Sequence, residues 1–459
     1  MNSAWQQFTL SNLPLHQWRG ASYLYKLVGL LQSWRQGSWL LQWAEQIAAL
    51  LVAIIFALGP FVSTALIGIL LIACAGFWVL LTLSEPSEKS QLTPIHLLVL
   101  LYWGIATVAT ALSPVKVAAR SGLVKLTLYL LLFALMARVL RSSRLRSWII
   151  TIFLHISLIV SSYGIRQHFF GAKELATWTD PTSASANLTR VYSYLGNPNL
   201  LAGYLIPAVA LSLAAVFAWQ RLFPKALALT MFIVNCACLI LTYSRGGWIG
   251  FLVCIFASLV LLVYWYSRQL PPDWRPWAMP ILLGNCAAVV IIAVIFVEPV
   301  RDRVSSIFAG RSDSSNNFRI NVWSAVLDMI RDRPILGIGP GNNAFNKVYP
   351  LYQRPKYTAL SAYSIFLETI VETGFIGFAC FLWLLTVTFN QGVKQLSRLR
   401  SIANPQGFWL IGAIAAIAGM LAHGLVDTVW YRPQVNTLWW LMVGIIASFY
   451  IPRVEIRNQ

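Results

Sequence analysis

Residues 199–219 read NLLAGYLIPAVALSLAAVFAW and include no charged side chain. An apolar run of about twenty residues crosses the hydrocarbon core of a bilayer as an α-helix. Because lipid offers no hydrogen-bond partners, a spanning segment must satisfy its backbone internally, and the period-two alternation of a membrane barrel is absent here. The stretch therefore predicts a transmembrane helix.

Similar apolar runs recur along the chain and predict an all-α, polytopic bundle of about 12 spans. Hydrophobic residues make up 58% of the 459 residues and charged residues 11%, whereas about a quarter of a soluble domain is charged. The six cysteines fall inside apolar runs, so we expect buried thiols and no metal site. The predicted spans are 43–61, 63–83, 94–112, 122–139, 147–164, 199–219, 226–243, 247–266, 278–297, 364–388, 407–427 and 434–451.

The distribution of basic residues predicts the orientation. The formal charge of +19 is spread over many short connections, which is typical of the positive-inside bias and argues against a nucleic-acid surface. With the long loop 298–363 set aside, because long loops largely escape this rule, Lys and Arg are about twice as numerous on the side of the two termini. We therefore expect both termini in the cytoplasm, with the chain in the plasma membrane. No cleavable signal peptide is evident. The predicted division is 1–42 as a cytoplasmic segment, 43–297 as spans 1–9, 298–363 as an extracytoplasmic loop, 364–451 as spans 10–12 and 452–459 as a cytoplasmic tail.

The long loop contains a predicted amphipathic helix. Apolar residues recur at helical spacing, after Ser314 and Ser315 as candidate caps and before Pro334 as a stop signal. We expect this helix to lie on the membrane or to cap the bundle. The glycine-rich run 334–341 follows no strand, so it predicts a tight turn and not a nucleotide fingerprint. The recurring apolar residues are Phe318, Val322, Val326 and Ile330.

Three groups of ionisable residues lie at the ends of predicted spans. Arg245 stands in a short connection, where an arginine snorkels to head groups, pairs with a carboxylate or binds an anion. Glu368 and Glu372 share one helix face, where they partner an arginine or handle protons or substrate. His423 and Asp427 have the same spacing, which is typical of a hydrogen-bonded interface pair, or of a pair that moves protons or fixes a basic group.

Several motifs together resemble the O-antigen ligase and polymerase-like superfamily of bacterial membrane proteins. Their order along about residues 190–380 and the long loop make the set fairly specific. The run 359–364 and the stretch 423–433 are most similar to the cyanobacterial branch assigned to inorganic-carbon (bicarbonate) transport. The motifs are Gly196-Asn197-Pro198-Asn199, Ser244-Arg245-Gly246-Gly247, Arg319 with Trp323, Pro334–Gly341, and Glu368–Phe378 with Glu372 and Gly374.

The resemblance implies roles for individual residues. In family ligases two arginines hold a lipid-linked diphosphate sugar donor, and a histidine of the outer loop acts in transfer; Arg245 and Arg319 match the arginine positions. None of the five histidines lies in 298–363, and the place of the family histidine reads Ala362-Tyr363-Ser364. This departure leaves Tyr363 and Glu368 as candidate substitutes. The residues expected to contact substrate are Asn197, Asn199, Arg245, Arg319, Glu368, Glu372, His423 and Asp427.

Functions of different classes remain open. The first is transport of a small anion such as bicarbonate, by this chain or by a complex with other membrane subunits, which the missing histidine and the branch resemblance favour. The second is an enzyme, a ligase or polymerase that transfers an undecaprenyl-diphosphate-linked glycan to an acceptor. A non-catalytic membrane scaffold is the third. We expect contact with the lipid bilayer, no nucleic acid and no cofactor, and the balance favours transport.

Overall fold

The computed structural model describes residues 3–11, 13, 28–84, 92–173, 175, 189–308 and 310–451. This described part consists of helices, 3-10 turns and connections and contains no strand, so the all-α prediction is confirmed. The predicted tail at 452–459 lies outside the described residues, as do residues 176–188 of the polar connection before span 6.

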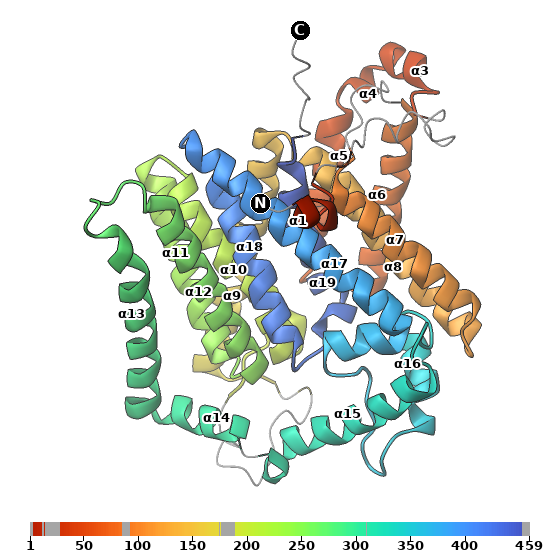
Figure 1. Ribbon diagram of the computed structural model, residues 1–459, viewed down its shortest axis with the longest axis vertical. Helices are drawn as coiled ribbons and strands as arrows, with labels where there is room; N and C mark the ends of the chain where they lie inside the picture. Colours follow the sequence, from red (N-terminus) through yellow and green to blue (C-terminus); the bar gives the residue numbers. More distant parts are fainter. Residues whose placement is uncertain are drawn as a thin grey trace.

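Each predicted span coincides with a helix (Figure 1). Within the described ranges, ten of these helices are long and apolar enough to cross a membrane, while α5 and α19 have 15 and 16 residues. The chain is thus a multi-span helical membrane protein. The helices are α5 (Ala44–Leu58), α6 (Thr64–Ser84), α7 (Pro94–Ala111), α8 (Lys116–Val139), α9 (Ser143–Phe170), α10 (Pro198–Ala218), α11 (Leu222–Leu241), α12 (Arg245–Tyr266), α13 (Arg275–Phe296), α17 (Ile365–Ser401), α18 (Gly407–Gly424) and α19 (Pro433–Ser448).

The end of span 11 differs from the prediction. The span was expected to reach residue 427, but α18 ends at Gly424, and the 3-10 turn η6 (Val429–Tyr431) leads into α19. Asp427 accepts the N–H of Thr428 through Oδ1 at 2.8 Å. This bond stabilises the non-helical connection that leads from α18 into η6. The helical spacing assumed for Asp427 therefore does not apply.

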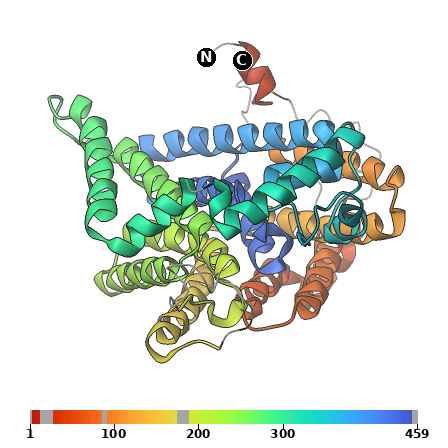
Figure 2. The same cartoon turned by 90° about the horizontal axis from the view of Figure 1, so that it is seen from below.

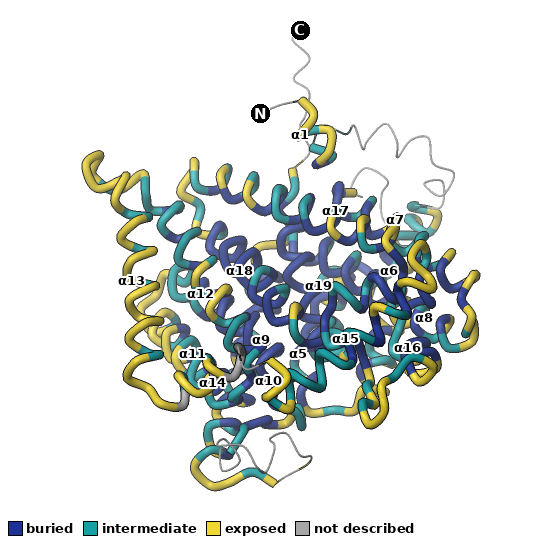
Figure 3. The backbone as a smooth tube through the Cα atoms, turned by 60° about the horizontal axis from the view of Figure 1, so that its bottom comes forward, coloured by how far each residue is buried: buried dark blue, intermediate teal, exposed yellow. Residues whose placement is uncertain are grey.

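Burial divides the bundle into a centre and a periphery (Figure 3). Nearly all residues of α10, α18 and α19 are buried, because other helices pack on every side of them. By contrast, α13 has no buried residue and packs mainly on α12 and α14. A helix that is apolar all round and exposed all round is a lipid-facing helix.

The two ends of the bundle carry different segments (Figure 1). α14 (Glu298–Phe308), α15 (Ser314–Asp332) and α16 (Asn342–Val348) gather at one end, which we call the loop end. α1 (Ser3–Phe8) and the C-terminal end of α19 lie at the opposite end. The short helices α3 (Gln32–Gly37) and α4 (Trp39–Gln42) precede α5.

α15 is the predicted amphipathic helix, and it lies across the loop end as a cap (Figure 2). Its buried side chains pack against the turn that follows it, against α16 and against the start of α17. The N-cap is Asp313, whose side chain accepts the Asn316 N–H at 2.8 Å, so the predicted caps Ser314 and Ser315 are wrong. The buried residues are Val322, Ala325, Val326, Met329 and Ile330.

α17 is broken at Gly374, where the glycine-rich turn 334–341 docks. Gly374 has φ +67° and ψ −174°, so the helix that was predicted as continuous over 364–388 is interrupted there. A Cβ on Gly374 would lie 2.0 Å from the Ile335 carbonyl oxygen, which explains the requirement for glycine. Hydrogen bonds of 2.8–2.9 Å join Ile338 N–H to Val371 O, Gly339 N–H to Glu372 O and Phe375 N–H to Pro334 O.

Candidate functional site

A polar cavity of about 440 Å³ lies at the loop end. It is formed by the N-terminal ends of α10, α12 and α15 together with the turn after α18. We call it the arginine cavity. The charged side chains that line it are Arg190, Arg245, Arg319, Arg432, Asp313 and Asp427.

Arg245 is the first residue of α12, whose N-cap Ser244 accepts the Gly247 N–H. Its guanidinium donates to Asp313 Oδ1 at 2.9 Å and to Asn316 Oδ1 at 3.3 Å. Of the three roles expected for Arg245, pairing with a carboxylate is thus observed. Arg245 also lines the cavity, where its guanidinium group can contact a bound anion.

The partner carboxylate Asp313 is held in its ionised form. Burial alone would raise its pKa, but hydrogen bonds from Arg245 and from the Asn316 N–H outweigh burial, so the pKa of Asp313 lies below its ordinary value. The Arg245–Asp313 pair therefore joins α12 to α15 at neutral pH.

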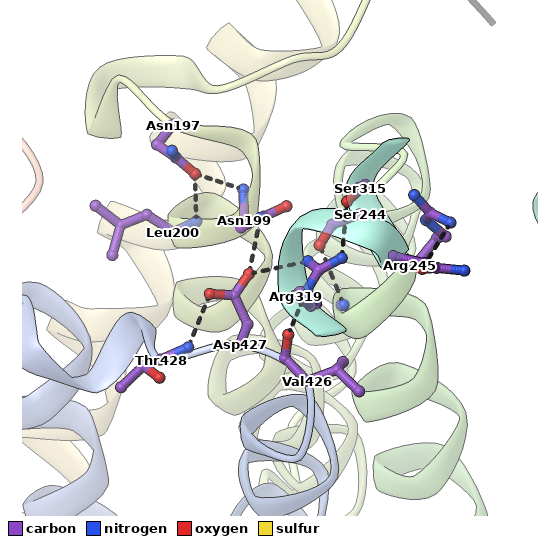
Figure 4. A network of polar contacts seen from close by, with 12 residues as sticks. Asn197, Asn199, Leu200, Ser244, Arg245, Ser315, Arg319, Val426, Asp427 and Thr428 are labelled. Atoms are coloured by element: carbon purple, nitrogen blue, oxygen red, sulfur yellow. Dashed lines mark hydrogen bonds and ion pairs between the residues drawn. The ribbon is translucent and has the colours of Figure 1, made fainter. Parts of the chain in front are cut away.

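Arg319 comes from the second turn of α15 and is fixed by three oxygen atoms (Figure 4). Nε donates to the Val426 carbonyl at 2.8 Å, and Nη1 donates to Ser315 Oγ at 2.8 Å. Nη2 lies 4.0 Å from Asp427 Oδ2. The guanidinium is thus oriented before any ligand arrives.

The two asparagines of the predicted set have separate roles. Asn197 caps α10 by accepting the N–H groups of Asn199 and Leu200 through Oδ1, at 2.8 and 3.2 Å. Asn199 donates to Asp427 Oδ2 at 2.7 Å, and its own Oδ1 accepts from Arg190 at 3.0 Å. Asn199 therefore connects an arginine and an aspartate of the cavity.

The charge of the cavity favours an anionic ligand. Its described lining has four arginines against two aspartates, a formal charge of +2. Arginine presents a planar set of donors that matches carboxylate and phosphate oxygens. The arrangement is suited to binding a phosphate-like group.

Tyr363, a candidate substitute for the family histidine, also lines the arginine cavity. Burial, with the nearby Asp427 adding to it, raises the pKa of Tyr363 to about 12. The phenol therefore keeps its proton at neutral pH, which makes it a poor general base.

Glu368 and Glu372 lie in a different place. They line a second cavity of about 230 Å³, which shares Thr428 and Tyr431 with the arginine cavity. Glu368 Oε2 accepts the Ala362 N–H at 3.2 Å, and Glu372 Oε1 accepts the Gly341 N–H at 2.7 Å. Each glutamate thus holds a loop segment at the loop end. We call this second space the carboxylate cavity.

His423 lines neither of these two cavities. It is buried between α10 and α12, where a Cβ on Gly203 or Gly246 would lie 3.4 or 2.9 Å from the imidazole ring. Within the described part of the chain, its Nε2 has no hydrogen-bond partner, and no hydrogen bond joins it to Asp427. The expected His423–Asp427 pair is absent because Asp427 lies beyond the end of α18.

Three charged residues of the arginine cavity, Arg190, Asp313 and Arg432, are outside the set expected to contact substrate. Arg432 directly precedes α19, and Arg190 is the last basic residue before α10, from which the 3-10 turn η3 (Ser193–Leu195) separates it. Asp313 precedes the two serines predicted as caps, and aspartate is itself a favoured N-cap. Proximity to a span end and capping preference were the signals available for these residues.

Among the described residues, neither the cysteines nor other potential metal ligands form a further site. In the ranges described, no group of three or more His, Cys, Asp or Glu side chains is placed to hold a metal ion. Four cysteines are buried, whereas Cys236 and Cys286 are partly exposed, so the expectation of six buried thiols is wrong for these two.

Comparison with known proteins gives a match over part of the chain. Residues 226–382, from α11 into α17, match the family described as O-antigen ligase. The matched segment contains Arg245, Arg319 and Glu368. No curated protein matches the chain. The family match supports the O-antigen ligase-like superfamily and gives no support to the branch assigned to bicarbonate transport.

Proposed function

We propose that this protein is a membrane glycan ligase or polymerase, which transfers a glycan from a polyprenyl diphosphate donor to an acceptor. The observation that carries the proposal is the arginine cavity, which Arg245 and Arg319 both line at the loop end of a membrane bundle. The family match over 226–382 supports the same activity, so we favour it over the transport hypothesis.

The physical argument concerns the leaving group. When the bond between the sugar and the diphosphate breaks, negative charge develops on the diphosphate oxygen, and fixed guanidinium groups stabilise it without reorganisation. Arg319 is held by Val426 and Ser315 through Nε and Nη1, so it is already oriented. A cavity of about 440 Å³ is far larger than a bicarbonate ion requires, but it accommodates a diphosphate with part of a sugar.

Binding of farnesyl diphosphate to the full chain in lipid nanodiscs tests the proposal. We expect Arg245→Ala and Arg319→Ala each to weaken binding about tenfold or more, because each removes charge-assisted hydrogen bonds. Arg331→Ala is the matched control, since Arg331 lies on the same helix as Arg319 and its side chain is 77% exposed. Wild-type affinity in both cavity variants, or no binding by the wild type, would contradict the proposal.

A cellular experiment tests the activity itself. Deleting the gene is expected to shorten or remove a surface glycan and to accumulate its lipid-linked precursor. Surface glycans unchanged in length and attachment would eliminate the enzyme hypothesis.

A further inference from the structure

The carboxylate cavity has a lining of unusual composition for the interior of a membrane bundle. Two glutamates, Glu368 and Glu372, face it together with the aromatic side chains of Tyr102, Trp430 and Trp439. The rings of Trp430 and Trp439 have centroids 4.0 Å apart. Flat apolar faces therefore lie beside carboxylate oxygens in one small space.

An amide adds a hydrogen-bonding group to this lining. Asn436 donates through Nδ2 to the Trp430 carbonyl at 2.9 Å. Its Oδ1 is buried and has no partner among the described residues, although it belongs to a residue that lines the cavity. A buried acceptor without a partner costs free energy, which a donor group on a ligand would recover.

These groups select the chemistry of the ligand. Lys125 also lines the cavity, so its charged groups are one lysine and two glutamates, a formal charge of −1. An apolar ligand would leave these polar groups without partners, and the net negative charge disfavours an anion. A saccharide fits, because its C–H faces pack on aromatic rings while its hydroxyl groups donate to carboxylate and amide oxygens. The carboxylate cavity and the arginine cavity thus suit opposite kinds of ligand.

The two cavities meet at one wall. Thr428 and Tyr431 line both of them, so the two cavities are neighbours on either side of the segment that includes the η6 turn. Glu368, in the first turn of α17, is 6% exposed and is anchored by the Ala362 N–H. In the arginine cavity, both oxygens of Asp427 already accept hydrogen bonds, from Asn199 and from the Thr428 N–H.

We propose that the carboxylate cavity binds the acceptor saccharide and that Glu368 takes the proton of its attacking hydroxyl; this inference rests on the proposed function. The hydroxyl oxygen forms a bond to the anomeric carbon of the donor sugar. The bond from that carbon to the diphosphate oxygen breaks, and its electron pair stays with the diphosphate among the arginines. The hydroxyl proton passes to the Glu368 carboxylate, which supplies the base that the loop lacks.

Photo-labelling tests the saccharide site. The full chain in nanodiscs is irradiated with a disaccharide that bears a diazirine, and the labelled peptides are mapped by mass spectrometry. We expect labelling of residues 428–440, competition by the unmodified disaccharide, and about a fivefold loss of labelling in Trp430→Ala and Asn436→Ala, because these changes remove a stacking face and a hydrogen-bond acceptor. Trp277→Ala is the control, since Trp277 is 62% exposed on α13.

The outcomes separate this inference from the proposed function. Labelling that is absent, or unchanged in both cavity variants, overturns the saccharide site even if farnesyl diphosphate binds. Labelling only by a diazirine sugar attached to farnesyl diphosphate overturns the acceptor assignment, because the site would then hold the donor's sugar. Labelling that persists in Arg245→Ala supports a site independent of the donor.

Complementation of the deletion strain tests the base. We expect Glu368→Gln to leave surface glycan about a hundredfold or more below wild type, the size of a general-base contribution, while protein level and farnesyl diphosphate affinity stay normal. The lipid-linked glycan accumulates in that strain. The control is Asp332→Asn, at the exposed end of α15. Wild-type glycan in Glu368→Gln overturns the assignment, whereas lost diphosphate binding in this variant would identify Glu368 as structural.

Discussion

A single residue, Asp313, has two roles, since it caps α15 and pairs with Arg245. Asparagine keeps a capping oxygen but removes the negative charge. We therefore expect Asp313→Asn to bind farnesyl diphosphate about two- to fivefold more tightly, because a partly exposed ion pair contributes up to about 1 kcal/mol that the ligand no longer has to displace. Titration in nanodiscs measures the difference, and equal affinities would show that Asp313 does not compete with the ligand.

The alanine variant separates the two roles. Asp313→Ala loses the cap as well as the charge, so it is expected to destabilise the protein by about 1 kcal/mol relative to Asp313→Asn. Thermal unfolding in the same nanodiscs checks this. Equal unfolding temperatures for the two variants would contradict the capping role.

The sequence predicted part of this site and not the rest, for reasons that individual residues make clear. Arg245, Asn199 and Asp427 line one cavity, and the sequence had placed all three at the loop-side ends of predicted spans. The separation of Glu368 and Glu372 from them was not predictable. It depends on which way the two turns of α17 before the break at Gly374 face, and tertiary packing decides this.

At the scale of an element, the break in α17 leads to a mutational prediction. Gly374→Ala combines a left-handed φ with a contact of 2.0 Å to the Ile335 carbonyl oxygen, so we expect a loss of roughly 2–3 kcal/mol of stability. Hydrogen exchange should rise at Ile338 and Gly339, whose N–H groups bond across the break. Thermal unfolding and exchange mass spectrometry measure the two effects.

A glycine in α13 provides the control for this prediction. Gly284 is helical, and a Cβ added to it would meet no atom within 4 Å, so Gly284→Ala is expected to leave stability unchanged or slightly raised. If the two alanine variants unfold at the same temperature, the account of the break is wrong. Helical periodicity predicted α15 and the spans themselves, whereas docking of 334–341 into a broken helix depends on tertiary contacts.

At the scale of the whole molecule, the orientation in the membrane remains a prediction from charge distribution. Leu351 is 80% exposed at the loop end, and Ile402 is 65% exposed beyond the far end of α17. With both termini in the cytoplasm, Leu351→Cys reacts with a membrane-impermeant maleimide in intact cells, and Ile402→Cys reacts only after permeabilisation. The wild type, with its six native cysteines, is the background control. The reverse pattern would refute the orientation.

The isolation of α13 has a consequence for how this chain changes over generations. With no buried residue along 275–296, the side chains of this helix contact mainly lipid, so selection there acts on length and hydropathy and scarcely on the identity of each residue. In the central helices α10 and α18, most residues are buried against neighbouring helices, so a substitution there disturbs packing. Sequence drift should therefore be faster in α13 than in α10 and α18.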